Sequence, residues 1–217
     1  IFLIILGAIT SLSLPPFNYI FINFFTFSLF FLFLIKKDKD HKNSKLFFIY
    51  GWLFGFGYFV SNLYWISISL SFDQNFKFLI PLTLVLIPAV LSLFYGLVSY
   101  LFLVLKPKNS ISSFLTFALI FGVVEFFRGT ILTGFPWNLI AYSFSNQLEI
   151  LSITSIIGTY GFNLFCISLF ASPAIIILRK KNIGFLIFFL ITTLFFHING
   201  LSQKENFDKK FKKNYDY

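Results

Sequence analysis

Charged side chains are scarce in this 217-residue chain, in which Asp, Glu, Lys and Arg make up only 12% of the residues. A typical soluble domain carries about 25%. The hydrophobic share is 58%, which leaves too few polar residues to cover a core. The same balance excludes intrinsic disorder, because disordered chains combine high charge with little apolar surface. The composition therefore predicts a membrane protein that crosses the bilayer several times.

Residues for metal or nucleophilic chemistry are also scarce. The single cysteine, Cys166, excludes an internal disulfide and a cysteine metal cluster. It has no His, Lys or acidic neighbour that would favour a thiolate, so we expect it to be a small core residue. His41 and His197 have no second metal ligand nearby in the sequence, and phosphate-binding, zinc and Gly-x-Ser-x-Gly motifs are absent. No metal and no cofactor are expected.

Dividing the chain at its charges predicts an all-α, polytopic helical membrane domain with about seven transmembrane helices. The expected spans are 1–14, 17–35, 46–70, 78–105, 111–127, 150–178 and 183–198. Pro81 and Pro88 are the expected kinks of the fourth span. Residues 1–199 form the predicted transmembrane domain, and 200–217 a predicted extramembrane linker.

The beginning of the chain suggests that residues are missing before it. The first span has 14 residues and begins at Ile1, without a methionine, whereas a membrane-spanning helix needs about 20. A signal peptide is the alternative interpretation of this segment. Its usual basic start and small-residue cleavage site are not evident.

Three basic clusters predict the orientation. With seven spans, the clusters at 36–45, 106–108 and 179–181 fall on one side. By the positive-inside rule that side is cytoplasmic, so the N-terminus is inside and the tail after residue 199 is periplasmic. The tail is itself rich in lysine, against the rule. We interpret it as the start of a longer translocated domain, for which the rule weakens.

Ionisable residues in a span are costly, and Glu125 and Arg128 form such a pair. They are three positions apart, so on a helix they share one face. The pair either holds a polar head group or fixes the following loop. In the alternative interpretation, Arg128 extends to the membrane surface and Glu125 only partners it.

Two aromatic segments are candidates for the outer membrane surface. Gly134, Phe135, Pro136, Trp137 and Asn138 form a rigid aromatic turn after the predicted fifth span, although an ordinary interfacial turn would have the same composition. The other segment, 51–65, pairs small glycines suited to close helix packing. It ends in a second group of candidate residues: Asn62, Tyr64 and Trp65.

Taken together, these stretches resemble the apolipoprotein N-acyltransferase family of the bacterial envelope. Four stretches carry the resemblance, 7–18, 51–65, 125–138 and 158–164, in the family's order, and it covers essentially the whole chain to about Asn199. Its most specific part is Glu-Phe-Phe-Arg-Gly at 125–129, followed by Leu-Thr-Gly-Phe-Pro-Trp-Asn at 132–138.

The resemblance implies transfer of an acyl chain from a phospholipid to the N-terminal amine of a diacylglyceryl-cysteine lipoprotein, in the bacterial inner membrane. It implies a thioester intermediate on a cysteine of a nitrilase-like extramembrane domain, which follows the seventh span. The chain ends where that domain would begin. It is therefore expected to contain no catalytic residue and to be inactive alone.

The resemblance also suggests how the candidate residues are used. The partners are the phospholipid donor, the lipoprotein acceptor and membrane lipids, with no nucleic acid. Arg128 is hypothesised to pair with a lipid phosphate, and the aromatic residues to line the acyl entry. The alternatives are a small transporter or channel subunit, which would need a polar path through several spans, and a purely structural anchor.

Overall fold

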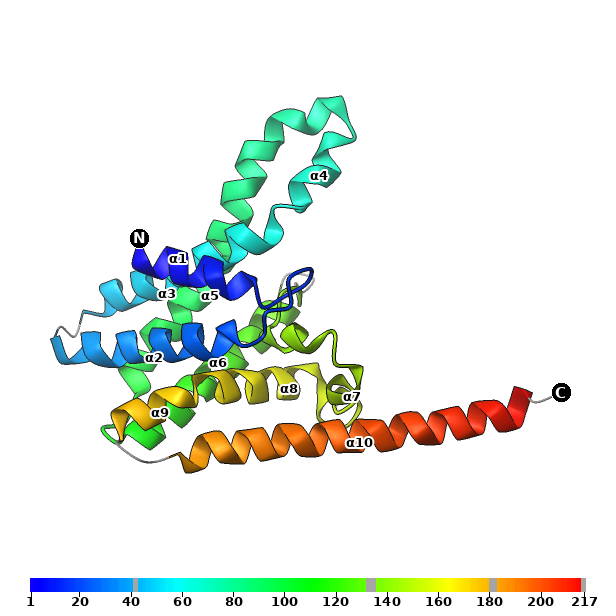
Figure 1. Cartoon of the computed structure of the whole chain (residues 1–217). Helices are drawn as coiled ribbons and strands as arrows, with labels where there is room; N and C mark the ends of the chain where they lie inside the picture. The colour runs from blue at the N-terminus through cyan, green and yellow to red at the C-terminus, as the bar shows by residue number, and fades with distance from the viewer. Residues whose placement is uncertain (41–42, 132–135, 180–182, 216–217) are drawn as a thin grey trace.

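The computed structural model describes residues 1–40, 43–131, 136–179 and 183–215 (Figure 1). Within these ranges the regular elements are all helical, as the all-α prediction requires. The elements are α1 (Phe2–Ser11), α2 (Ile22–Asp40), α3 (Ser44–Leu63), α4 (Ile66–Ser71), η1 (Gln74–Leu79), α5 (Ile80–Leu105), α6 (Ser110–Thr130), η2 (Ile140–Phe144), α7 (Leu148–Leu151), α8 (Thr154–Ala171), α9 (Pro173–Leu178) and α10 (Gly184–Tyr215).

Five helical segments in the described ranges are long and apolar enough to cross a membrane. They are Ser44–Leu63, Lys77–Leu105, Ser110–Thr130, Thr154–Leu178 and Gly184–Lys209. The other two of the seven predicted spans also contain helices, but α1 has only 10 residues and α2 ends in charged residues. The predicted count of seven is therefore approximate.

Several predicted boundaries are wrong, because turns interrupt the apolar runs. The second span was expected from residue 17, but α2 begins at Ile22. The preceding segment turns through a cis Pro15–Pro16 bond and Asn18, which has a φ of 57°. The third predicted span ends early, since α3 stops at Leu63 and a separate α4 follows.

The sixth predicted span is also divided, into α7, α8 and α9. Gly158 breaks the helical path inside α8 with a φ of 74°, and Pro173 begins α9.

The two prolines of α5 occupy different positions in the helix. Pro81 lies in the first turn, where its missing N–H costs no helical hydrogen bond, whereas Pro88 lies inside the helix.

Glycines allow α3 to pack closely against helices on two sides. A Cβ at Gly57 would collide with the Ile4 carbonyl of α1, and a Cβ at Gly51 with the Tyr95 carbonyl of α5. This confirms the packing role predicted for the small residues of 51–65, since only glycine lets backbones approach this closely.

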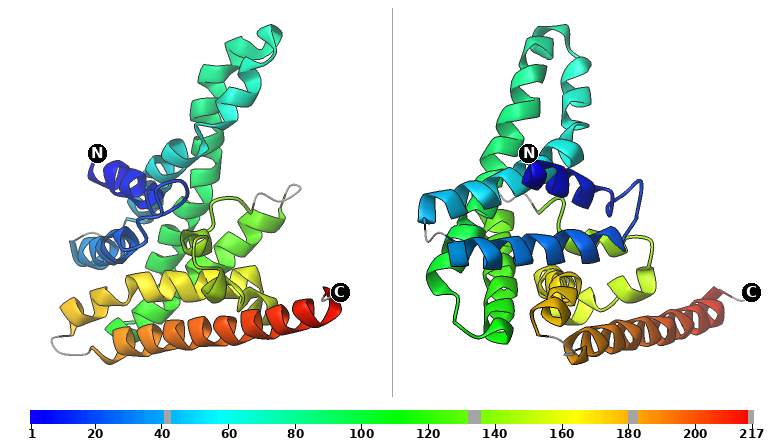
Figure 2. Two further views of the ribbon diagram at one scale, coloured as in Figure 1. Left: turned by 45° about the vertical axis from the view of Figure 1, so that its right-hand side comes forward. Right: turned by 60° about the vertical axis from the view of Figure 1, so that its left-hand side comes forward.

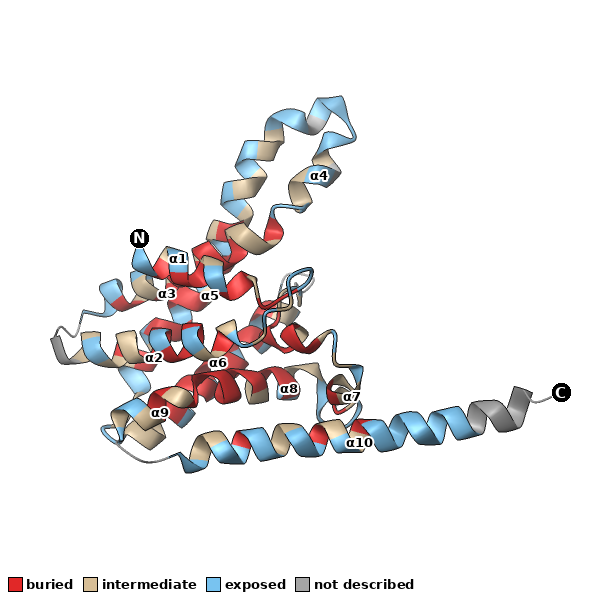
Figure 3. Ribbon diagram, in the orientation of Figure 1, coloured by how far each residue is buried: buried red, intermediate tan, exposed pale blue. Residues whose placement is uncertain are grey.

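Buried residues gather where the helices of the bundle face one another (Figure 3), and phenylalanine forms much of this core. Phe30 of α2 stacks on Phe54 of α3 with ring centroids 4.1 Å apart. Phe27 contacts Phe121 of α6 and Phe170 of α8. The aromatic rings thus join α2, α3, α6 and α8 around one core.

Two parts extend from this core. The hairpin of α4, η1 and the beginning of α5 projects away from the other helices (Figures 1 and 2). Helix α10 has 32 residues, about 48 Å of helix, compared with about 30 Å for the hydrocarbon layer of a bilayer. Because α10 continues to Tyr215, the predicted boundary after residue 199 falls inside a helix, and the division into two domains stays a prediction.

Candidate functional site

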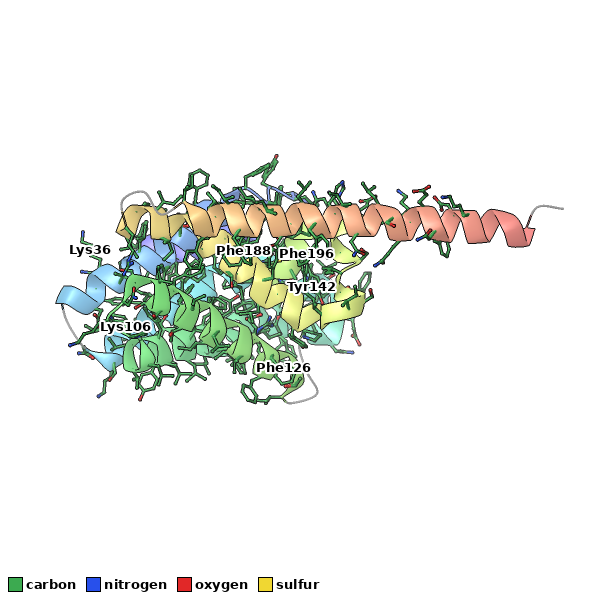
Figure 4. The ribbon with its side chains drawn as sticks, turned by 90° about the horizontal axis from the view of Figure 1, so that it is seen from below. Lys36, Lys106, Phe126, Tyr142, Phe188 and Phe196 are labelled. Atoms are coloured by element: carbon green, nitrogen blue, oxygen red, sulfur yellow. The ribbon has the colours of Figure 1, made fainter. Side chains whose placement is uncertain are left out.

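Residues from the three predicted basic clusters lie at one end of the bundle. The Lys106 Nζ lies 2.7 Å from the Asp38 carboxylate, and the Arg179 Nη2 donates to the Asn109 amide oxygen over 2.7 Å. Figure 4 shows Lys36 and Lys106 at this end and Phe126 and Tyr142 towards the other. Lys180, Lys181 and His41, which the sequence also places in these clusters, lie outside the described residues.

The opposite end contains the buried Glu125–Arg128 pair of α6. Arg128 Nε donates to Glu125 Oε1 over 3.0 Å, and its Nη2 donates to Oε2 over 2.6 Å. Glu125 is 0% exposed and Arg128 1% exposed. The interpretation in which Arg128 extends to the membrane surface is therefore wrong. The pair is internal, with the bidentate geometry that suits guanidinium and carboxylate.

This ion pair also holds the loop that follows α6. Arg128 Nη1 donates to the Trp137 carbonyl over 3.1 Å, and its guanidinium carbon lies 5.3 Å from the centre of the Phe59 ring. The Tyr58 hydroxyl donates to the next carbonyl, that of Asn138, over 2.7 Å. Asn138 itself has a φ of 58°, a left-handed conformation that asparagine tolerates better than most residues. Side chains of α3 and α6 thus fix two successive carbonyls of this turn.

The two aromatic segments singled out in the sequence meet here. Trp65, after α3, stacks on Trp137 with ring centroids 4.9 Å apart. Their exposed fractions are 39% and 45%, as suits indole rings at a membrane–water boundary. The contact brings together residues that are far apart in the sequence.

Beside these rings lies a cavity of about 380 Å³. Four of the predicted site residues line it: Asn62, Tyr64, Trp65 and Asn138. The other lining residues are Ser11, Leu14, Pro15, Pro16, Phe17, Ser61, Tyr142 and Ser145. Glu125 and Arg128 are not among them. They support the turn that carries Asn138.

Of the remaining predicted site residues, Gly134 and Phe135 lie outside the described residues, and Pro136 is half-buried. Gly129 precedes the end of α6, and a Cβ there would collide with the Tyr160 hydroxyl of α8. A larger residue at this position would therefore require the Tyr160 side chain to shift.

Burial raises the pKa of the Tyr142 phenol above its ordinary value, with Tyr160 acting in the same direction and Arg128 opposing. Tyr142 is thus a neutral hydrogen-bonding group at physiological pH.

Outside the cavity, a backbone hydrogen bond and the Lys204 ammonium lower the pKa of Glu149. Lys204 Nζ lies 3.3 Å from the Glu149 carboxylate and helps join α10 to α7.

Several residues of the site were missed as candidates in the sequence. Leu14 and Phe17 line the cavity, and the buried Tyr58 holds the Asn138 carbonyl. All three fall within stretches that carry the family resemblance, so a signal for them was present. Ser61 lies inside the 51–65 segment but was not singled out. Tyr142 had no local signal, since a tyrosine in a polar segment has many explanations.

Other reactive groups lie apart from the cavity. Cys166 is 0% exposed in α8 and has a free thiol, as expected for a core residue. Within the described part of the chain, no three His, Cys, Asp or Glu side chains are grouped so that they could hold a metal.

The fold and the site define a polytopic helical membrane protein with a hydrogen-bonding cavity at one end of its bundle. Residues 6–172 match the family model described as the apolipoprotein N-acyltransferase N-terminal domain. The chain belongs to this family.

Curated relatives agree with this assignment. An apolipoprotein N-acyltransferase from Rhodopseudomonas palustris is 37% identical over 174 residues, which are 79% of this chain and 32% of the relative. Those from Allorhizobium ampelinum and Brucella melitensis are 34% and 32% identical over 80% and 91% of this chain. The chain spans about a third of the length of these relatives, between 32% and 38%.

Proposed function

We propose that this chain is the membrane part of an enzyme that transfers an acyl chain from a phospholipid to the N-terminal amine of a diacylglyceryl-cysteine lipoprotein. Family membership supports the acyltransferase activity, and the cavity beside Trp65 and Trp137 carries the assignment of a lipid-binding role. This cavity favours a lipid-binding platform over a purely structural anchor. The catalytic cysteine belongs to an extramembrane domain that acts together with this one.

Within this proposal the candidate residues have two roles. Asn62, Tyr64, Trp65 and Asn138 line the lipid site, while Glu125 and Arg128 position the turn that carries Asn138. The guanidinium already bonds to Glu125 and Trp137, so a positioning role fits it better than direct phosphate binding. Gly134, Phe135 and Pro136 stay proposed lipid-binding residues on sequence grounds alone, and the first two lie outside the described residues.

The orientation belongs to the same proposal. The end that carries Lys36, Lys106 and Arg179 faces the cytoplasm, because lysine and arginine next to spans favour that side. The cavity and the end of α10 then face the periplasm of a bacterium, and the protein lies in the inner membrane. A domain attached after α10 would stand on the cavity's side.

A chimeric enzyme tests the function. Residues 6–172 of this chain replace the matched segment of the Rhodopseudomonas palustris relative, and transfer from phosphatidylethanolamine to a diacylglyceryl-cysteine peptide is measured. We expect the chimera to transfer the acyl chain. Asn62→Leu should lower the transfer rate about tenfold, since this change removes a polar side chain from the cavity. Asn75→Leu, at the tip of the projecting hairpin, is the control and should change the rate less than about twofold.

A chimera that inserts and unfolds cooperatively but transfers no acyl chain would overturn the proposal. Equal losses in the Asn62 and Asn75 variants would overturn the lipid-binding role of the cavity. In a separate assay, the 217-residue chain alone is expected to show no turnover. Turnover there would contradict the assignment of catalysis to another domain.

A further inference from the structure

The cavity beside Trp65 contains polar groups that the protein itself leaves unused. Asn62 Nδ2 donates to the Tyr58 carbonyl, Ser11 Oγ to the Ala8 carbonyl, and Ser145 Oγ to the Asn18 side chain. The side chains of Ser61, Asn138 and Tyr142 have no hydrogen bond among the described residues. All three line the cavity and are partly exposed. The cavity therefore offers these hydroxyls and this amide, among others, to a ligand.

The lining also lacks charge. None of its residues is acidic or basic, and burying an anion without a cation is costly. The nearby Arg128 does not supply that cation, because it is 1% exposed and paired with Glu125. A phosphate group would gain no ion pair inside this cavity, whereas uncharged acceptors match its unused donors.

The position of the cavity fits one part of a lipid. Trp65 and Tyr64 lie at its wall, and such side chains mark the boundary between hydrocarbon and water. In a glycerolipid, the ester groups lie at that boundary, between the acyl chains and the head group. Leu14, Phe17 and the two prolines give the cavity an apolar wall beside its donors.

We propose that this cavity binds the glycerol ester groups of a diacyl lipid through neutral hydrogen bonds from Ser61, Asn138 and Tyr142, and leaves the charged head group outside in water. This inference rests on the proposed function, because it names the part of the lipid substrate that the site recognises. The ester carbonyl oxygens accept the hydrogen bonds. Head-group charge then contributes little to affinity.

Binding to the 217-residue chain in detergent micelles tests the inference, with fluorescence of the stacked Trp65 and Trp137 as the readout in a Trp52→Phe background. The probes are dipalmitoyl phosphatidylcholine, its diether analogue, dipalmitoyl phosphatidylglycerol and dipalmitoylglycerol. We expect the diether to bind about tenfold more weakly than the diester, since two neutral hydrogen bonds weaken. The three diester lipids should agree within about threefold, because phosphate makes no ion pair in the cavity.

Variants of the donors sharpen the test. Tyr142→Phe and Ser61→Ala should each reduce the diester-to-diether ratio, because each removes one donor with little change of shape. Asn75→Leu is the control and should leave the ratio unchanged. These changes avoid Asn138, whose left-handed backbone would strain most replacements.

Three results would overturn the inference: equal affinity for diester and diether, no saturable binding of any probe, or binding of phosphatidylglycerol about tenfold tighter than that of dipalmitoylglycerol. The last result would identify phosphate as the recognised group. The chimera assay keeps this inference separate from the proposed function. An active chimera with equal diester and diether affinities refutes only the ester site, while ester selectivity with an inactive chimera refutes only the acyltransferase role.

Discussion

Replacing Arg128 by methionine should destabilise the protein strongly, because it leaves the Glu125 carboxylate buried without its partner. The substitution removes the two hydrogen bonds to Glu125, the one to the Trp137 carbonyl and the contact with the Phe59 ring. Removing one partner of a buried pair costs about 3–5 kcal/mol. We expect the free energy of unfolding of Arg128→Met to fall by that amount.

The double variant Glu125→Leu/Arg128→Met separates an unpaired charge from lost packing. Two apolar side chains of similar size restore a neutral interior, and such replacements are often tolerated without loss. The Trp137 carbonyl still loses its donor, which costs about 1 kcal/mol. The double variant should therefore be more stable than either single variant by about 2–4 kcal/mol.

Denaturant unfolding in micelles, followed by tryptophan fluorescence, measures both variants. Near-ultraviolet circular dichroism reports separately on the Trp65–Trp137 stack, which should loosen in the double variant because its anchor to Arg128 is gone. The reasoning is refuted if Arg128→Met lies within about 1 kcal/mol of the parent protein, or if the double variant is as unstable as the single ones.

Two further predictions concern helix packing and pH. Gly57→Ala should cost about 1–3 kcal/mol in the same unfolding assay, because its Cβ would collide with the Ile4 carbonyl. The matched Gly161→Ala, whose Cβ would have its nearest contact at 3.5 Å, should be neutral or stabilising by up to about 1 kcal/mol; equal effects of the two changes would contradict the close packing. Diester-lipid affinity should be constant from about pH 6 to 9. Burial raises the pKa of the Tyr142 phenol, so the phenol stays neutral throughout this range, and stability falls only at higher pH, as pH rises from the unfolded pKa through the folded pKa. A transition near pH 7 in a binding titration would refute the neutral lining.

The sequence was informative wherever local chemistry decides the structure. Charge-free runs located the long helices, and the spacing of Glu125 and Arg128 predicted their shared face. The basic clusters were expected on one side, and Asp38–Lys106 and Arg179–Asn109 contacts join them at one end. Each of these inferences depends on neighbours in the sequence or on a count of spans.

Boundaries were less predictable, because apolar composition does not show where a helix breaks. Hydropathy continues past Leu63 and across Gly158, although the backbone turns at both places. A glycine with positive φ or a turn of aromatic residues does not lower the hydropathy of an apolar run, so hydropathy does not reveal the break. Their conformation depends on the helices packed around them.

The cavity could not be derived from the sequence, because its walls come from distant segments. The Tyr58–Asn138 hydrogen bond joins residues 80 positions apart, and the Trp65–Trp137 stack joins the same two segments. The sequence predicted that the candidate residues of both segments, 62–65 and 134–138, lie near the outer membrane surface. Their meeting required the three-dimensional packing of α3 and α6 against α5.

The Glu125–Arg128 pair therefore influences the site through the backbone. Arg128 holds the carbonyl of Trp137, and Tyr58 holds the carbonyl of Asn138, so two residues of one turn are fixed from two helices. That turn presents the Trp137 ring to Trp65 and the Asn138 amide to the cavity. A charged pair placed in the cavity itself would attract phosphate and draw water into the apolar wall. Buried and neutralised beneath the turn, it can orient the neutral donors without competing with them for the ligand.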